Sequence, residues 1–375
     1  MRVGIITFSA SHNCGSMLQA FALQEVLKRR YSADVEIIDF INAGSRKIYN
    51  VITWELSRYA IEHNWNSIIH LPTMLKVKKD YTEFSNIYLK KTSKSYYNEN
   101  QLTGFENRYD LLIAGGDQVW NVRVSDGSDA FFLNFVKNVR KVSYSPSLGG
   151  TNIMKFGRDP DRYRQYLSEF EAISVREPNG QKWLEELTGR KVKIIADPTL
   201  ILTPEEWQEY LPVPDIKEKY IFNYAFYHNR KKTNIALQKI SDKVGLPIYV
   251  MDIKSWAIYR LDKYNIKKYP KTGPLAFLGL MKNAQLVLTQ SFHGTLFSAL
   301  FNRCFWSYNW EEMTHGEDDR ATAILEQLGL NERYQMIDDL VNMSVMEPID
   351  YEECNKNIGQ LRQEAYDYID SFMKR

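Results

Sequence analysis

The alternation of short apolar strands with amphipathic helices predicts an α/β chain built from two Rossmann-like, doubly wound domains. The chain has 375 residues, which exceeds the size at which a single hydrophobic core keeps growing. The strand and helix rhythm breaks at Asp197-Pro198, where proline restricts the backbone. We therefore expect two domains that face each other across a central cleft, with the crossing between them near this break.

The first domain is expected to span residues 1–203. Apolar runs predict strands at 3–8, 35–40, 111–114, 142–145, 173–175 and 192–195, which would form one doubly wound sheet. Residues 46–105 break the alternation and predict a helical insertion or lid. This insertion carries a run of lysines, at 76, 78, 79, 90, 91 and 94. A solvated face is the favoured interpretation of the run, and contact with acidic lipid headgroups stays open.

The second domain is expected to span residues 204–348. Strands are predicted at 220–226, 248–251, 286–288 and 305–308, with helices at 233–244, 274–283, 294–301 and 320–328. Residues 349–375 form a C-terminal amphipathic helix, because apolar side chains recur there at helical spacing. Its stripe could pack on the first domain or on a second copy, so a homo-oligomer stays open.

Composition narrows the class of protein. The 48 basic and 46 acidic side chains nearly balance, so no global field recruits nucleic acid. The three cysteines show no CxxC spacing and fit a reducing cytoplasm, and no His, Cys, Asp or Glu cluster has metal-ligand spacing. No segment approaches the ~20 apolar residues of a membrane span. We expect a cytoplasmic protein without a metal, with a peripheral place at the inner face of the membrane left open.

Residues 289–296 carry the strongest functional signal. A buried strand ends there in a turn that contains Ser291, His293 and Gly294 and opens a helix. Such a turn offers free N–H groups and a positive dipole end to an anion. His293 adds a side chain that can give or take a proton near neutral pH. The competing interpretation is a helix capped by Ser291 or Thr295, with a histidine satisfied by a neighbour.

Two other strand ends carry candidate binding residues. Asn13 and Gly15 lie in a small-residue turn that lets the backbone approach a ligand, although it matches no dinucleotide or phosphate-loop motif. The loop at 114–121 holds the residue types that bind sugars, with Trp120 as a stacking face and Asp117, Gln118 and Asn121 as hydrogen-bonding groups. The alternative is an Asp/Asn-capped loop with a core tryptophan.

Arginines could supply the charge that an anionic substrate needs. Arg176 stands at a strand tip, where a planar guanidinium suits carboxylate or phosphate oxygens. Pairing of Arg176 with Glu177 or another acid is the alternative. His315 and Arg320 follow the His293 helix and could add positive charge to the same cleft.

Six motifs together resemble the polysaccharide pyruvyl transferase family, and they occur in the family's order. They are NCGSMLQAFALQ (13–24), GGDQVWN (115–121), SYSPSLG (143–149), SVRE (174–177), DPTL (197–200) and SFHG (291–294). The resemblance spans roughly residues 3–330, apart from the insertion. It implies a GT-B-like pair of Rossmann-like domains. It also implies transfer of the enolpyruvyl unit of phosphoenolpyruvate to a sugar of a surface polysaccharide or its lipid-linked precursor, which leaves a pyruvate ketal and phosphate.

The resemblance implies roles for the candidate residues. His293 and Arg176 become the catalytic pair. Arg176, Ser291, Gly294, His315 and Arg320 become donor-binding residues, and either His315 or Arg320 takes the place of a lysine that some members have downstream of the histidine. The acceptor would meet Asn13, Gly15, Asp117, Gln118, Trp120 and Asn121. No cofactor is implied beyond phosphoenolpyruvate as co-substrate. The alternatives are a nucleotide-sugar glycosyltransferase of the same two-domain design and a glycan-binding relative without turnover.

Overall fold

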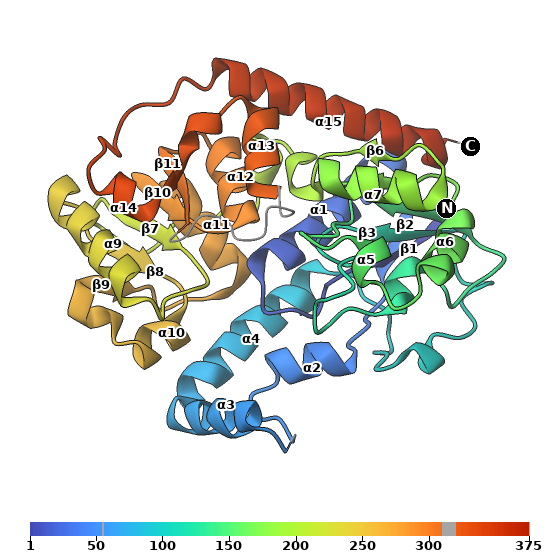
Figure 1. The fold of residues 1–375 in the computed structure, drawn as a ribbon, viewed down its shortest axis with the longest axis horizontal. Coiled ribbons are helices and arrows are strands. Elements are labelled where there is room, and N and C mark those ends of the chain that lie inside the picture. The colour runs from blue at the N-terminus through green and yellow to red at the C-terminus, as the bar shows by residue number, and fades with distance from the viewer. Residues whose placement is uncertain (55, 310–319, 375) are drawn as a thin grey trace.

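The computed structural model describes residues 1–54, 56–309 and 320–374. Two lobes lie side by side, and each is a parallel sheet with helices on its faces (Figure 1). Parallel strands need crossover connections, and helices provide these connections in both lobes. The carboxyl ends of the strands carry the loops that hold the candidate residues, which is where ligands bind in open α/β sheets.

The first lobe is built on four parallel strands in the order β2-β1-β3-β4. Their bounds are Arg2–Ile6 (β1), Asp34–Ile37 (β2), Leu111–Gly115 (β3) and Arg140–Tyr144 (β4). A parallel bridge from Val142 to Ala172 joins β4 to the chain just before a short parallel pair, Ser174–Val175 (β5) and Lys193–Ile194 (β6). The predicted single sheet is therefore a four-stranded sheet with a two-stranded extension. The lobe's helices are Cys14–Tyr31 (α1), Ile153–Phe156 (α5), Pro160–Ser168 (α6) and Pro178–Thr188 (α7).

The second lobe holds six parallel strands in the order β12-β11-β10-β7-β8-β9. The strands are Ile221–Tyr224 (β7), Ile248–Val250 (β8), Ile266–Lys268 (β9), Leu286–Thr289 (β10), Phe305–Asn309 (β11) and Tyr334–Met336 (β12). The helices are Pro204–Gln208 (α8) before the sheet and, within the lobe, Lys231–Val244 (α9), Ile253–Ile258 (α10), Gly273–Asn283 (α11), Phe292–Leu300 (α12), Arg320–Leu328 (α13) and Ile337–Leu340 (α14). Strands β9 and β12 were not expected from the sequence. Both are three-residue edge strands, too short and too polar to show an apolar run.

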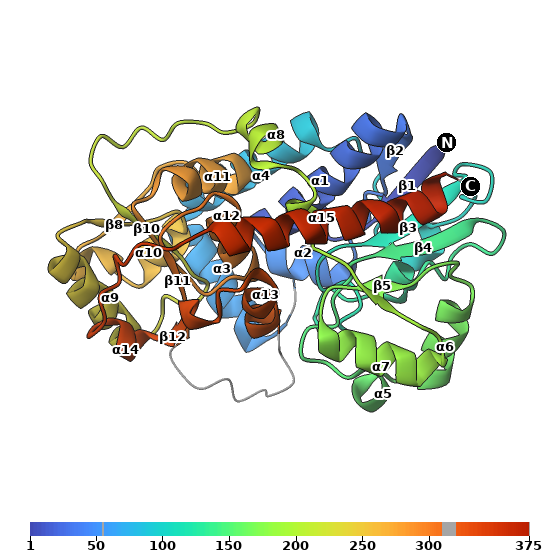
Figure 2. The same cartoon turned by 90° about the horizontal axis from the view of Figure 1, so that it is seen from above.

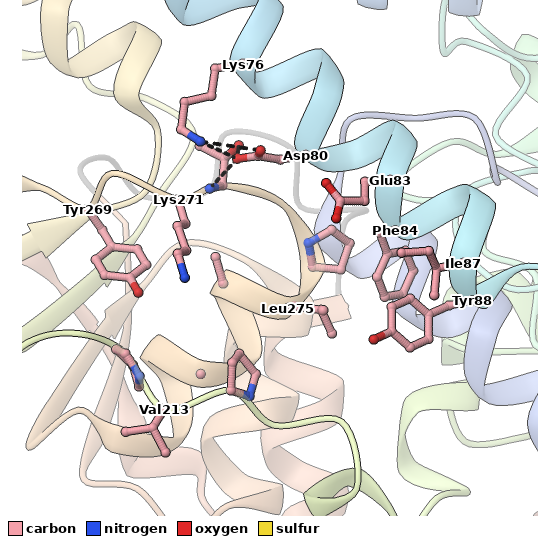
Figure 3. A pocket seen from close by; sticks show the side chains of 16 residues that line it. Lys76, Asp80, Glu83, Phe84, Ile87, Tyr88, Val213, Tyr269, Lys271 and Leu275 are labelled. Atoms are coloured by element: carbon pink, nitrogen blue, oxygen red, sulfur yellow. Dashed lines mark hydrogen bonds and ion pairs between the residues drawn. The ribbon is translucent and has the colours of Figure 1, made fainter.

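The insertion forms three helices, Ala43–Tyr49 (α2), Arg58–Ile69 (α3) and Leu71–Tyr88 (α4). Helix α4 reaches the second lobe, where the carboxylate of Asp80 accepts hydrogen bonds from the N–H (2.9 Å) and hydroxyl (2.8 Å) of Thr272. A cavity of about 390 Å³ lies between α4 and the second lobe (Figure 3). None of the predicted site residues that the structure describes lines it, so this cavity is not part of the candidate site.

The C-terminal helix α15 (Glu352–Met373) lies across both lobes, as Figure 2 shows. The hydroxyl of Tyr368 donates to the carbonyl of Ser143 (2.9 Å), and Nε of Arg362 donates to that of Leu200 (2.9 Å). The helix also packs against α12 and α13. Its apolar stripe is thus covered within the chain. Within residues 1–54, 56–309 and 320–374, no helix is long and apolar enough to cross a membrane.

Candidate functional site

Loops from both lobes bring three chemically active side chains together. Arg176 follows β5 and Asp197 follows β6 in the first lobe, whereas His293 lies in the first turn of α12 in the second lobe. All three side chains are buried. The carboxyl ends of the parallel strands lie at one edge of each sheet, and the loops that follow them meet between the lobes, where His293 and Arg176 both reach Asp197.

One carboxylate oxygen joins the other two residues. Nη1 of Arg176 donates to Oδ2 of Asp197 at 2.8 Å, and Nε2 of His293 lies 3.4 Å from the same oxygen. The second oxygen, Oδ1, accepts from the N–H and hydroxyl of Thr199 at 3.0 and 2.8 Å. The separation of His293 from Oδ2 allows an ion pair, but Nε2 makes no hydrogen bond in the described structure. Asp197 therefore positions a histidine that keeps a ring nitrogen for another partner.

Arg176 is surrounded by further groups that bear on its charge. Its Nη2 lies 3.9 Å from Asp117 and its Nε lies 3.9 Å from Glu177. The guanidinium carbon stands 4.0 Å from the centre of the Phe292 ring, a cation–π distance. The pairing of Arg176 with an acid, which the sequence left as an alternative, is present through Asp197. Nε of Arg176 and Oε2 of Glu177 have no hydrogen-bond partner among the described residues.

The pKa values of the two buried carboxyl groups, Asp197 and Glu177, are shifted in opposite directions. Burial alone would raise the pKa of Asp197, but the charges of His293 and Arg176, together with the hydrogen bond from the N–H of Thr199, hold that pKa well below its usual range. Burial raises the pKa of Glu177, and the charges of Arg176 and Arg320 only partly oppose this. Asp197 is therefore the ionised partner of the site, and Glu177 is the acid that protonates more readily.

Gly15 determines how closely α1 approaches the imidazole of His293. A Cβ at position 15 would lie 2.0 Å from Nδ1 of His293, so a glycine is needed for the imidazole to occupy its place. Asn13 caps the helix, because its side-chain oxygen accepts from the N–H groups of Gly15 (2.9 Å) and Ser16 (3.3 Å). The predicted acceptor residues Asn13 and Gly15 thus lie at the site, as a helix cap and as a close packing contact.

The loop after β3 reaches the same site through Asp117. The hydroxyl of Ser16 hydrogen-bonds to Asp117, which links the loop to α1. The amides of Gln118 and Asn121 bond to each other at 2.9 Å. Of the predicted sugar-binding group, Asp117 is therefore joined to Arg176, while Gln118 and Asn121 stand next to it and satisfy each other.

Trp120 was predicted as a face for sugar stacking, and the structure corrects this. Its side chain is fully buried and stacks on Phe132 with ring centres 5.3 Å apart. Its indole N–H donates to the carbonyl of Phe131 at 3.0 Å. No face of the ring reaches the cleft, so Trp120 is a core residue of the first lobe.

Three of the predicted donor residues, Ser291, Gly294 and Arg320, lie at the start of α12 and α13. Ser291 precedes α12 but makes no side-chain cap, so neither it nor Thr295 caps the first turn; Thr295 instead bonds back to the carbonyl of Ser291 (3.2 Å). A Cβ at Gly294 would lie 2.0 Å from the Thr289 hydroxyl, which explains the glycine by packing. Arg320 begins α13 within electrostatic reach of Glu177. The predicted residue His315 lies outside the described residues.

Three site residues were not singled out from the sequence. Asp197 was noted as part of an interdomain break and of the DPTL motif, and Glu177 as part of the SVRE motif and a possible partner of Arg176, but neither was given a role in the site. Gln290 directly follows β10, and both polar atoms of its side chain are buried without a hydrogen-bond partner in the described part of the chain. The usable signal for all three is their position directly after a strand at the ligand-binding edge of a parallel sheet.

A cavity of about 260 Å³ opens beside Asn13 and is shared by both lobes and the insertion. Its lining mixes aromatic rings with polar groups, among them Tyr49, Tyr81, Tyr224, Phe226 and Lys254. Asn223 also lines it, and its buried amide nitrogen has no partner among the described residues. No three His, Cys, Asp or Glu side chains of the described residues are placed to share a metal ion.

Solved structures with the same arrangement of lobes define the fold class. A UDP-GlcNAc 2-epimerase from Methanocaldococcus jannaschii superposes with a TM-score of 0.55 at 10% identity, over 98% of this chain and 99% of that one. The S. aureus MnaA–UDP co-structure gives a TM-score of 0.53 at 12% identity, over 100% of this chain and 96% of that one. An O-GlcNAc transferase mutant from Thermobaculum terrenum gives a TM-score of 0.51 at 10% identity, over 100% of this chain and 67% of that one. The predicted fold is therefore confirmed as GT-B, with two Rossmann-like lobes.

The family model for polysaccharide pyruvyl transferases matches residues 13–312, which is most of the chain. The protein belongs to the polysaccharide pyruvyl transferase family. This confirms the family resemblance of the six motifs, each of which lies within the matched range. No curated protein is significantly similar to the chain in sequence.

Proposed function

We propose that this protein transfers the enolpyruvyl unit of phosphoenolpyruvate to a sugar of a surface polysaccharide or its lipid-linked precursor. The products are a pyruvate ketal and inorganic phosphate. Family membership supports the reaction class. The observation that carries the proposal is the meeting of Arg176 and His293, from different lobes, at one oxygen of Asp197. A guanidinium and an imidazole placed together between lobes suit a small acid that carries both a phosphate and a carboxylate.

The donor would bind between Arg176 and the first turn of α12. Arg176 is largely balanced by Asp197, but its Nε is unpartnered and can donate to an oxygen of the donor. The first turn of α12 has no side-chain cap, so its N–H groups and dipole remain for the anion. Arg320 supplies a second positive charge beside Glu177. Ser291, Gly294 and, by resemblance, His315 complete the proposed donor site.

His293 is the proposed general acid. It would give its proton to the methylene carbon of phosphoenolpyruvate, which makes the adjacent carbon cationic and open to attack by a sugar hydroxyl. Phosphate then leaves, and a second hydroxyl of the same sugar closes the ketal. Asp197, ionised and close to Nε2, orients the ring and balances the charge of the imidazolium. Proton transfer from a positioned side chain typically contributes about 10² to 10⁴ in rate.

The acceptor would enter from the cavity beside Asn13. Asp117 stands next to Arg176 and can accept a proton from a sugar hydroxyl, and Gln118 and Asn121 line the same loop. Aromatic rings on the cavity wall give a sugar an apolar face to lie against. We expect the reaction to need only phosphoenolpyruvate and the acceptor, without a metal or organic cofactor. We also expect it to take place in the cytoplasm.

Acceptor-dependent phosphate release tests the proposal. Purified protein is incubated with phosphoenolpyruvate and a lipid-linked sugar preparation, and phosphate is measured alongside a mass spectrum of the glycan. We expect phosphate release that needs the acceptor, together with added pyruvate on the sugar. If the protein transferred sugar from a nucleotide sugar and did not use phosphoenolpyruvate, this proposal would be wrong and the protein would be a glycosyltransferase. Binding of either donor without turnover would indicate a glycan-binding relative.

A further inference from the structure

Helix α3 of the insertion turns its polar face inward and its apolar face toward solvent. Its inward face consists of small and polar side chains, with Ala60 and Ser67 buried and His63 nearly so. Its outward face is apolar, since the exposed fractions of Ile61, Trp65 and Ile68 are 71%, 66% and 60%. These three lie at i, i+4 and i+7, which is one stripe of a helix. A helix of a soluble protein normally turns such a stripe toward the core.

Polar contacts fix α3 in this orientation. His63 pairs through Nε2 with the carbonyl of Asn50 (3.0 Å). The side-chain amide of Asn64 bonds to both the N–H (2.9 Å) and the carbonyl (2.8 Å) of Thr53. Ser57 caps the first turn through the N–H of Ala60. His63, Asn64 and the first turn are therefore held by hydrogen bonds, whereas the buried hydroxyl of Ser67 has no partner among the described residues. The apolar stripe is left on the surface.

Neighbouring side chains extend the stripe into a patch. Trp54 is 94% exposed, and Leu71 and Leu75 at the start of α4 are also exposed. We define the α3 patch as Trp54, Leu56, Ile61, Trp65, Ile68, Ile69, Leu71 and Leu75. Figure 1 shows α3 at the lower edge of the molecule, at the end of α4 and away from both sheets. Large contiguous apolar patches on a soluble protein mark an interaction surface.

The composition of the patch and its surroundings favour a lipid bilayer as the occupant. Tryptophan with aliphatic side chains is typical of the membrane interface, where an amphipathic ring meets both headgroups and acyl chains. Residues 54–80 contain four Lys or Arg side chains, at 58, 76, 78 and 79, and three carboxylates, Glu55, Glu62 and Asp80. Arg58 pairs with Glu62 and Lys76 pairs with Asp80, so the attraction to anionic headgroups is assigned to Lys78 and Lys79. Lys78 and Lys79 are exposed about one turn beyond Leu75. Basic residues near a bilayer are attracted to anionic headgroups by about 1 kcal/mol each.

We propose that the α3 patch inserts into the interfacial layer of an anionic membrane and holds the cleft at its surface. Helix α4 connects the patch to the cavity beside Asn13. Leu71 and Leu75 of α4 belong to the patch, and three other α4 side chains line the cavity, namely Met74, Val77 and Tyr81. A lipid-linked acceptor could then reach the cavity without leaving the bilayer. The inference rests on the surface itself, and only its link to the acceptor rests on the proposed function.

Vesicle co-sedimentation of the full chain tests the proposal. Phosphatidylcholine vesicles with and without a third of phosphatidylglycerol are the probes. We expect binding to the anionic vesicles, and at least a tenfold loss of affinity in a Trp65→Ser/Ile68→Ser double variant. The control is Val213→Ser, an even more exposed apolar side chain outside the patch, which should bind like the wild type. Lys78→Gln/Lys79→Gln should reduce the preference for anionic vesicles.

Two outcomes would overturn the proposal. One is the absence of wild-type binding to either vesicle. The other is a dimer, seen by sedimentation velocity, that the double variant dissociates while vesicle binding is unaffected, because the patch would then be an interface between two copies. Both changed side chains are exposed, so circular dichroism and the unfolding midpoint should match the wild type. If the membrane proposal fails, phosphate release with a water-soluble acceptor is still expected. The two experiments therefore distinguish failure of the membrane proposal from failure of the proposed reaction.

Discussion

The backbone of Gly15, at the start of the chain's first helix, packs directly against the imidazole of His293 from the opposite lobe. A Cβ at residue 15 would lie 2.0 Å from Nδ1 and 2.3 Å from Cγ of that ring. Real Cβ atoms do not approach so closely, so any side chain at position 15 must displace the ring. The position of the proposed acid therefore depends on a missing side chain in the other lobe.

Gly15→Ala should impair catalysis while the fold is retained. Displacing the His293 ring by about 1 Å is expected to lower kcat about a hundredfold. The comparison is made with Gly359→Ala on α15, where the added Cβ meets nothing within 4 Å and should leave the rate unchanged. Acceptor-dependent phosphate release measures both. Wild-type turnover in Gly15→Ala would show that the ring's place is unimportant.

His293→Gln removes the proposed proton donor but keeps a polar side chain of similar reach. We expect kcat to fall by about 10² to 10⁴, the usual worth of general acid catalysis. Affinity for phosphoenolpyruvate, measured by calorimetry, should change little, because Arg176 and the first turn of α12 are still present. A normal kcat with weakened donor binding would instead make His293 a binding residue.

Asp197→Asn removes the charge that links Arg176 in one lobe to His293 in the other. Arg176 would lose the negative charge of its buried 2.8 Å partner, and an uncompensated charge left by breaking a buried pair costs roughly 3 to 5 kcal/mol of unfolding free energy. The matched control is Glu62→Gln, whose pair with Arg58 is exposed and should contribute about 0.5 kcal/mol or less. Urea unfolding of the two variants and the wild type provides the comparison. Equal small losses would mean that Asp197 does not hold the site together.

The fold could be predicted from the sequence because most strands and helices carry a local pattern of apolar residues. Each of the ten predicted strands is present with shifted ends, since an apolar run between turn residues is a local feature. The edge strands β9 and β12 lack such a run and were missed. Helix α3 shows the limit of periodicity: the pattern predicts an apolar face but not that the face points away from the protein.

The site was only partly predictable, because its essential feature is a meeting of distant residues. Arg176 and His293 could each be nominated from residue type and position after a strand. Their common partner Asp197 lies 21 positions beyond Arg176, and nothing local assigns the pair. Trp120 was misassigned for a related reason, since a core tryptophan and a sugar-stacking one have the same sequence context. Only packing distinguishes them.

Trp120→Phe tests that correction. The aromatic ring is kept, but the indole N–H bond to Phe131 is lost and the core is left underfilled. We expect a loss of about 1 to 3 kcal/mol in the free energy of unfolding, and an unchanged KM for the acceptor. Denaturant unfolding and acceptor titration give the two quantities. An increased KM with undiminished stability would return Trp120 to the acceptor site.

His12 should make stability depend on pH on the acidic side of neutrality. Its ring stacks on Tyr81, with ring centres 5.1 Å apart. Burial, with a smaller effect of the Lys78 charge, lowers the pKa of His12 from 6.5 to about 4. The folded state thus binds this proton less readily than the unfolded state. The stabilisation is complete above the unfolded pKa of 6.5 and is lost as the pH falls from 6.5 toward 4.

At about pH 5 this loss amounts to about 2 kcal/mol for the wild type, relative to about pH 7.5. His12→Asn, which has no proton to bind, should lack that part of the loss when unfolding is measured at both pH values. Lys78→Gln should diminish the loss, because removal of the nearby charge raises the pKa of His12 toward its unfolded value. If His12→Asn lost as much stability as the wild type over this range, the imidazole would already be accessible to protons in the folded protein, and its place between the insertion and α1 would be more open than the structure describes.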